Sequence, residues 1–151
     1  MQIKNPTEKI IDKDAPEGSC LCFILRLVLK HPTLSLEEVS KSMGLKPHQG
    51  HSVGTQKMTP RGNFLDGVNR ETFFGKTEQF FDRNDFFGCA ANLAESLAEH
   101  SEFFWKIRSE GVRVAIYIDL IGSQSIGDVL LPRQIEKLSS LGIDFGGEVF
   151  P

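Results

Sequence analysis

The sequence has no long apolar run and no strong excess of charge of either sign. Its longest apolar stretch, from Cys20 to Leu29, is about half the length that a membrane-spanning helix needs, and residues 1–6 lack the apolar core of a signal peptide. The 17 basic and 20 acidic residues give a formal net charge of -3 and a pI near 5.8, whereas general nucleic-acid-binding proteins usually carry a basic excess. We therefore expect a cytoplasmic protein that has no membrane partner and does not bind nucleic acid.

Cysteine is scarce as well. Cys20, Cys22 and Cys89 are odd in number, and the first two are only two residues apart in an apolar run. Residues at that spacing share one face of a strand, which is a poor start for a disulfide framework. We expect all three to be buried, reduced thiols rather than redox or metal-binding residues.

The chain also lacks the motifs that identify common catalytic and metal sites. There is no P-loop, no CxxC, no HExxH and no paired-carboxylate cluster, and no serine, cysteine or threonine lies in a nucleophile-elbow context. His48 and His51 could share a divalent ion, but a zinc site needs a third and usually a fourth ligand, and none lies nearby in the sequence. The sequence thus predicts no metal and no cofactor, and it gives an enzyme no residue-level support.

The length of 151 residues is that of one ordinary domain. Residues 1–19 are polar, contain Pro6 and Pro16 and show no periodicity, so we expect a flexible N-terminal tail there. Residues 20–151 should then form a single α+β domain.

Strand-like and helix-like patterns alternate along this domain. The strongest are a helix start at Ser35 with Glu38 three residues later, and a last helix that begins at Pro132 and stops at Gly142. The expected elements are a strand at 21–29, a helix between Ser35 and Gly44, an irregular or edge-like stretch at 44–64, a strand at 71–81, a helix starting at Asp82 or Asn84 and continuing to Gly111, a strand at 112–120, a helix between Pro132 and Gly142, and a strand at 143–150. The order strand, helix, strand, strand, helix, strand, helix, strand predicts a ferredoxin-like, split βαβ-type sheet, mostly antiparallel, with helices packed on one face.

Two segments also match the pattern of a known family. Residues 34–47 read LSLEEVSKSMGLKP and lead into a basic loop that ends near Gly54, while residues 104–111 read FWKIRSEG and lead into an alternating strand, followed later by the helix at 131–143. Over about residues 20–150 the chain resembles the bacterial domain-of-unknown-function family 4279. The resemblance implies a compact bacterial α+β domain and supplies no catalytic residues. The family often has tryptophan in its third strand, where this chain has Thr72-Phe73-Phe74, so the register of the middle strands stays open.

A basic, glycine-rich stretch is the first candidate site. It contains Lys46, His48, His51, Lys57 and Arg61 and has no acidic residue between Gly44 and Phe64. Glycines let a backbone approach an anion closely, and lysine and arginine supply charge. We weigh this anion cradle against a solvated loop whose cations balance acidic helices.

Polar residues inside two apolar strands are the second candidate. Arg26 interrupts the first strand, and Arg113, Tyr117 and Asp119 lie on the polar face of a later one. If the two strands are neighbours, Arg26 and Asp119 either form an ion pair that closes this side of the sheet or belong to a polar face that receives a ligand.

Aromatic doublets are the third candidate. Phenylalanine occurs 12 times against one tyrosine and one tryptophan, and several lie in pairs such as Phe73-Phe74. Adjacent residues of a strand point to opposite faces, so one ring of a pair is either exposed, in a patch suited to protein binding or self-association, or covered by another element.

We therefore expect a noncatalytic protein-interaction module, with an inhibitory or immunity-type role as one concrete version. Its partner would be another protein or a second copy of the chain, since a free sheet edge can build a dimer. The alternative is a small-ligand or anion-binding protein, or a weak enzyme, that uses the basic stretch 46–61 and the polar sheet face. The candidate residues are Arg26, Lys46, His48, His51, Lys57, Arg61, Phe73, Phe74, Tyr117 and Asp119.

Overall fold

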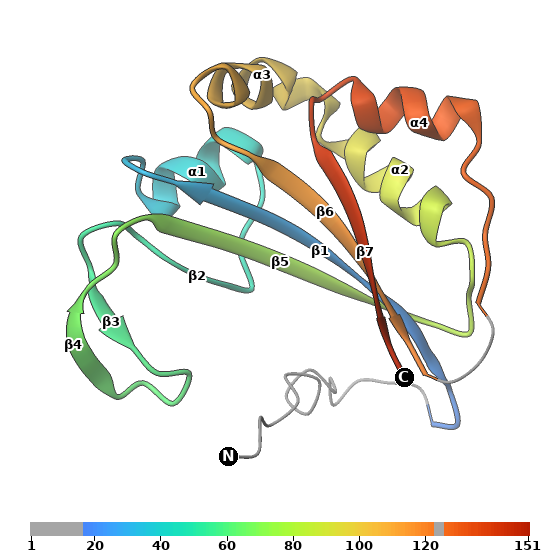
Figure 1. Ribbon diagram of the computed structural model, residues 1–151, viewed down its shortest axis with the longest axis horizontal. Helices are drawn as coiled ribbons and strands as arrows, with labels where there is room; N and C mark the ends of the chain where they lie inside the picture. Colours follow the sequence, from blue (N-terminus) through green and yellow to red (C-terminus); the bar gives the residue numbers. More distant parts are fainter. Residues whose placement is uncertain (1–16, 123–125) are drawn as a thin grey trace.

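The computed structural model describes residues 17–122 and 126–151, so most of the tail expected at 1–19 lies outside the described residues. Five strands form one sheet in the order β2-β5-β1-β6-β7 (Figure 1). Their bounds are β1 Leu21–His31, β2 Gln49–His51, β5 Thr72–Phe81, β6 Val114–Ile121 and β7 Asp144–Phe150. Neighbouring strands run antiparallel except β6 and β7, which are parallel and are joined through a helix, as a parallel connection requires.

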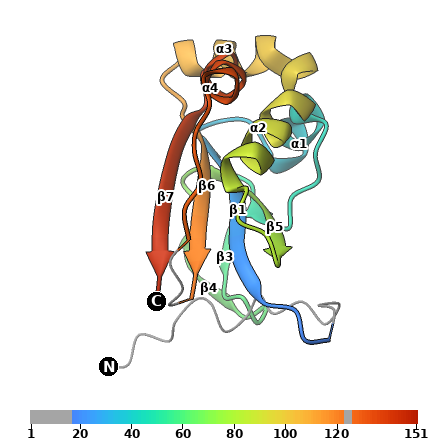
Figure 2. The same cartoon turned by 90° about the vertical axis from the view of Figure 1, so that its right-hand side faces the viewer.

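The helices gather on one side of this sheet (Figure 2). They are α1 Leu36–Met43, α2 Phe86–Ser96, α3 Ser101–Ser109 and α4 Pro132–Ser139, with a 3₁₀ turn at Ala98–His100 between α2 and α3. The start predicted for α1 is confirmed, since the Ser35 hydroxyl accepts a hydrogen bond from the Glu38 amide at 3.2 Å and the Glu38 carboxylate accepts one from the Ser35 amide at 2.7 Å. Within the described ranges, every helix is too short or too polar to cross a membrane.

The core lies between the helices and the sheet. Every second residue of the central strand β1 points toward the helices and is buried, as Leu25, Leu27 and Leu29 are. The same side of the sheet contributes Phe74 from β5 and Ile116 from β6, which are fully buried. One cluster of buried side chains therefore joins the sheet to all four helices.

The fold class is confirmed as α+β, with a sheet that is antiparallel apart from one pair, but the exact ferredoxin-like order is not confirmed. Four strands instead of two lie between α1 and α2, because the stretch expected to be irregular or edge-like contains β2 and β3 (Gln56–Met58). Strand β3 pairs with β4 (Phe64–Val68) in a separate two-stranded sheet. The helix expected to continue to Gly111 is interrupted at Leu97. Short exposed strands produce no apolar alternation, which is why the sequence pattern missed them.

The expectation that all three cysteines are buried is wrong for two of them. All three thiols are free, but only Cys89 is buried, whereas Cys20 is exposed and Cys22 is half-buried. Cys20 precedes the first residue of β1 and Cys22 is its second residue, and burial along the strand begins only at Phe23. Burial raises the pKa of the Cys89 thiol, which keeps it protonated at neutral pH.

Candidate functional site

The side of the sheet opposite the helices carries the polar residues singled out in the sequence. The strand registers align Arg26 with Thr77 on one neighbour and with Tyr117 on the other, so these side chains share a face. We call this surface the open sheet face; it comprises Arg26, Val28, Lys30, Thr77, Tyr117, Asp119 and Glu148. No described helix covers it (Figure 2).

Arg26 and Asp119 form the ion pair that the sequence suggested. The Arg26 Nε donates to one carboxylate oxygen of Asp119 at 2.5 Å, and its terminal nitrogen donates to the other at 2.8 Å. Glu148 lies 3.6 Å from the guanidinium, and the Tyr117 ring centroid lies 5.1 Å from it. The pKa of Arg26 is raised, chiefly by the hydrogen bonds to Asp119. This guanidinium therefore already has partners within the chain, which favours a structural role.

Tyr117 lines two hollows on the open sheet face. One has a volume of about 620 Å³ and is lined by Lys30, Arg113, Ala115 and Gly146 among others. The second has about 270 Å³ and reaches Arg26 and Gly75. A Cβ at Gly146 would lie 2.9 Å from the Tyr117 ring, so glycine is what allows this ring to lie across β7.

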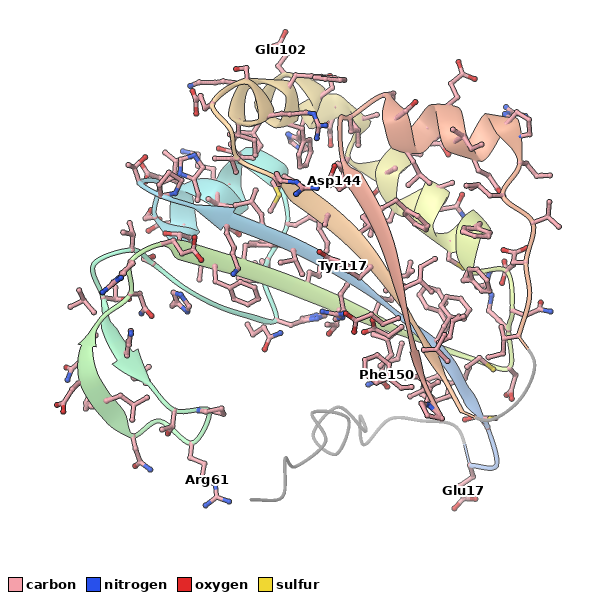
Figure 3. All side chains as sticks on the ribbon, in the orientation of Figure 1. Glu17, Arg61, Glu102, Tyr117, Asp144 and Phe150 are labelled. Atoms are coloured by element: carbon pink, nitrogen blue, oxygen red, sulfur yellow. The ribbon has the colours of Figure 1, made fainter. Side chains whose placement is uncertain are left out.

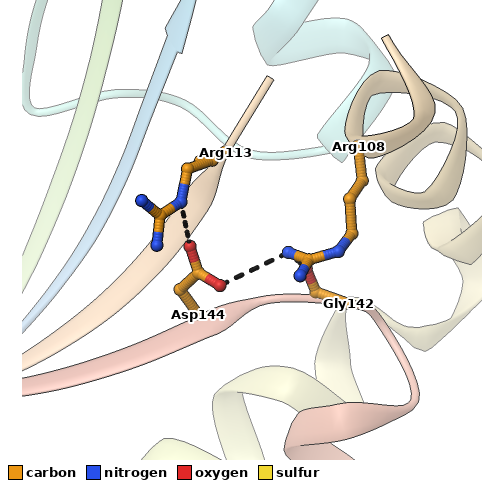
Figure 4. Close-up of polar contacts among 4 residues, drawn as sticks. All are labelled: Arg108, Arg113, Gly142 and Asp144. Atoms are coloured by element: carbon orange, nitrogen blue, oxygen red, sulfur yellow. Dashed lines mark hydrogen bonds and ion pairs between the residues drawn. The ribbon is translucent and has the colours of Figure 1, made fainter. Parts of the chain in front are cut away.

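A second charged cluster lies at one end of the larger hollow (Figure 4). Asp144 accepts a hydrogen bond from the Arg113 Nε at 2.6 Å and one from Arg108 at 3.3 Å, and Arg108 also donates to the Gly142 carbonyl at 2.9 Å. These hydrogen bonds, first of all the one from Arg113, lower the pKa of Asp144. Two guanidinium groups thus share one carboxylate, and the Arg113 side chain is 80% exposed. The sequence pattern indicated Arg113 but gave no signal for Arg108 or Asp144, because Asp144 comes beside Arg113 through the parallel pairing of β6 and β7 and Arg108 reaches it from α3.

The basic stretch does not form one anion cradle. His48 is at the sheet edge, where its Nδ1 accepts a hydrogen bond from the Thr77 amide at 3.1 Å, and Lys46 is exposed just before it. Lys57 is on β3, and Figure 3 places Arg61 at the far tip of the β3–β4 hairpin, away from Tyr117. Of the two alternatives, the separation of these cations favours the solvated loop over the anion cradle, because β2 holds one part of the stretch to the sheet while the hairpin projects.

The two histidines do not form a metal site either. The His51 ring lies 5.9 Å from the Phe73 ring, whereas His48 binds Thr77. Across residues 17–122 and 126–151, no three histidine, cysteine, aspartate or glutamate side chains lie close enough together to hold a metal ion.

The predicted aromatic pair is mostly covered. Phe74 is completely buried against the helices, and Phe73 is half-buried. A Cβ at Gly75 would lie 3.1 Å from the Phe73 ring, so this ring lies over a position that lacks a side chain. Of the two alternatives for this pair, the structure therefore favours coverage over an exposed patch.

Exposed apolar side chains occur instead on the β3–β4 hairpin. Met58 pairs directly with Phe64, and Val68 pairs with Gln56, with a break in register between the two pairs. Met58 is 57% exposed, Phe64 68% and Val68 53%. We call these three residues the apolar hairpin face. The aromatic doublets in the sequence gave no signal for this face, because Phe64 has no aromatic neighbour.

The hairpin is well anchored at its base and closed at its tip. The hydroxyl of Thr72, a fully buried residue, donates to the Leu34 carbonyl and accepts from the Val53 amide at 2.8 Å. At the tip, the Thr59 amide donates to the Asn63 carbonyl at 2.8 Å. The hairpin projects below the sheet, on the side away from the helices (Figure 1). It therefore presents its apolar face in a defined conformation.

Comparisons with known proteins give no further guide: no family model, no curated protein and no solved structure matches this chain. The resemblance to family 4279 therefore stays a prediction.

Proposed function

We propose that the chain is a noncatalytic interaction module that binds a partner protein through the apolar hairpin face. The observation that carries this proposal is that Met58, Phe64 and Val68 are each more than half exposed on the two paired strands of an anchored hairpin. Two-stranded hairpins are marginally stable in water without a packed face, and exposed apolar patches commonly mark protein contacts. Covering the three side chains would contribute about 1 to 2 kcal/mol each, before the cost of association.

The charges around this face indicate the chemistry of the partner. Residues 53–70 contain the cations Lys57, Arg61 and Arg70 against the single carboxylate of Asp66. A partner with an apolar centre and an acidic rim would complement both features and would associate faster at low salt. An inhibitory or immunity-type role, in which the hairpin blocks an acidic surface of another bacterial protein, is the version that we favour.

A second candidate is a small anionic ligand in the larger hollow beside Tyr117. The observation in its favour is the volume of about 620 Å³ next to Arg113, whose exposed guanidinium shares Asp144 with Arg108. A carboxylate or phosphate would bind the remaining donors of Arg113, and the Tyr117 ring would contact the rest of the molecule. A small molecule that remains bound through purification and is lost on Arg113→Ala would favour this candidate.

The test of the interaction module is affinity capture from bacterial lysate with the tagged wild-type chain and two variants. Phe64→Ser removes the most exposed ring of the hairpin, and Val129→Ser is the matched control, because Val129 is 69% exposed but outside the hairpin. We expect one stoichiometric protein with wild type and control that is lost with Phe64→Ser. Equal capture by all three proteins, or no captured protein, would contradict the proposal.

We propose that the protein is cytoplasmic, because its net charge is weakly negative and its three cysteines are free thiols. Membership of family 4279 is part of the same proposal.

A further inference from the structure

Strand β7 ends the sheet with an unpaired edge. No described strand lies beyond it, whereas the opposite edge is the three-residue strand β2. Exposed edges are usually protected by charged side chains, above all lysine, by proline or by a bulge. Residues Asp144 to Phe150 contain no lysine and no proline and carry charge only at Asp144 and Glu148, and they pair with β6 without a break in register. This edge is therefore suited to pairing with another strand.

The backbone direction determines which residues of β7 present groups at that edge. The Phe150 carbonyl accepts a hydrogen bond from the Gly122 amide at 2.9 Å, so Phe150 points toward β6. The N–H and C=O groups of successive residues point to alternate sides of a strand. Phe145, Gly147 and Val149 therefore direct theirs outward.

We propose that two copies of the chain pair through β7, antiparallel, about a two-fold axis at Gly147. This register sets Gly147 opposite itself and Phe145 opposite the second copy's Val149, so every outward-directed residue meets another. Each such pair exchanges both of its backbone hydrogen bonds. The two five-stranded sheets would become one continuous sheet with all helices on the same face.

The side chains are self-complementary in this register. Phe145 is 37% exposed and Val149 70%, and both point to the helix side, where they would cover each other twice. Glu148 would face Gly146 of the second copy, so no like charges lie directly opposite. An edge strand alone buries less than the roughly 1,600 Å² of a standard interface. Helix α4 contacts β7, and Ile135 on this helix and Leu131 just before it are 48% and 51% exposed, so they can supply further apolar area.

Sedimentation equilibrium of the purified chain tests the edge. We expect a mass near twice 16.9 kDa for wild type, with a dissociation constant at least tenfold higher for Val149→Lys. Gly147→Pro should also raise the dissociation constant at least tenfold, because it removes an outward-directed N–H group. Within one chain, a Cβ at Gly147 would approach only the Ile118 carbonyl, at 3.6 Å. Val129→Lys, a substitution of another exposed valine, should leave the dimer unchanged. A monomeric wild type, or an unaffected dimer in Val149→Lys and Gly147→Pro, would overturn the proposal.

Charge reversal tests the register. Adding Phe145→Glu to Val149→Lys would set opposite charges across the axis twice, so the dimer should return and weaken with salt. A double variant that is folded by circular dichroism yet stays monomeric would overturn the register about Gly147. The dimer is independent of the hairpin proposal, since Phe64→Ser should leave the mass unchanged and Val149→Lys should leave partner capture unchanged.

Discussion

Replacing Arg26 by methionine should destabilise the protein more than replacing Asp119 by asparagine. The Asp119 side chain is 8% exposed, so loss of Arg26 leaves a carboxylate with little access to water. The Arg26 side chain is 28% exposed, and after Asp119→Asn it still lies 3.6 Å from Glu148 and over the Tyr117 ring. The two halves of one ion pair should therefore have unequal effects.

The expected sizes follow from this difference in burial. Breaking a fully buried ion pair costs about 3 to 5 kcal/mol, mostly for the charge left behind. Arg26→Met should fall near the lower limit, at about 3 kcal/mol, because Asp119 can gain some hydration once the guanidinium is gone. Asp119→Asn keeps one acceptor oxygen and leaves a solvated cation, so it should cost about 1 kcal/mol.

Urea unfolding at pH 7 measures both effects. For a slope of about 2 kcal/mol per molar urea, the midpoint should fall by about 1.5 M for Arg26→Met and by about 0.5 M for Asp119→Asn, with the slope unchanged. The double variant should cost less than the sum of the two. Equal costs, or a cost below about 0.5 kcal/mol for Arg26→Met, would refute the reasoning and make Arg26 available for a ligand.

Three further predictions concern stability. Burial lowers the pKa of His31 below its usual 6.5, so as the pH falls below about 6.5 the His31 imidazole is protonated in the unfolded chain before it is in the folded one, and the free energy of unfolding should fall. His31→Leu should reduce this dependence of the free energy of unfolding on pH between pH 8 and 5. An unchanged dependence would assign it to other groups. Phe74→Ala should lower the free energy of unfolding, measured with urea, by about 3 to 5 kcal/mol, whereas Phe64→Ala should change it by no more than about 0.5 kcal/mol. Similar changes for the two variants would contradict the burial of the Phe74 ring and the exposure of the Phe64 ring. Gly44→Ala should lower the melting temperature, because Gly44 has a φ of 65° and a Cβ there would lie 2.7 Å from His100 Nε2; an equal or higher melting temperature would contradict this.

Features set by local sequence were predictable. The capping box at Ser35 and the alternation of β6 depend on residues within one element; the capping box is present, and burial alternates from Val114 to Ile118 but not at Asp119, which is buried. The Arg26–Asp119 ion pair was predictable only on the condition that β1 and β6 are neighbours. That condition is a property of the sheet order, which no local pattern determines.

The remaining features depend on contacts between distant segments. The apolar residues of the β3–β4 hairpin are separated by polar residues except at Phe64-Leu65, so its apolar face becomes visible only when Met58 and Phe64 are paired. The sequence left open whether the aromatic doublets are exposed or covered, and Phe80 is partly buried, with its ring stacked on that of the buried Phe23 at 4.6 Å between centroids. Arg108 and Asp144 are separated by 36 positions. Burial and pairing of this kind follow from tertiary packing, to which periodicity is insensitive.

Hydrogen–deuterium exchange of the chain with and without its captured partner tests the central claim most directly. The account predicts that the partner slows exchange of backbone amides in residues 56–68, while those of β6 keep their rates. Slower exchange confined to the open sheet face, with the hairpin unchanged, would contradict the claim that the apolar hairpin face is the binding surface.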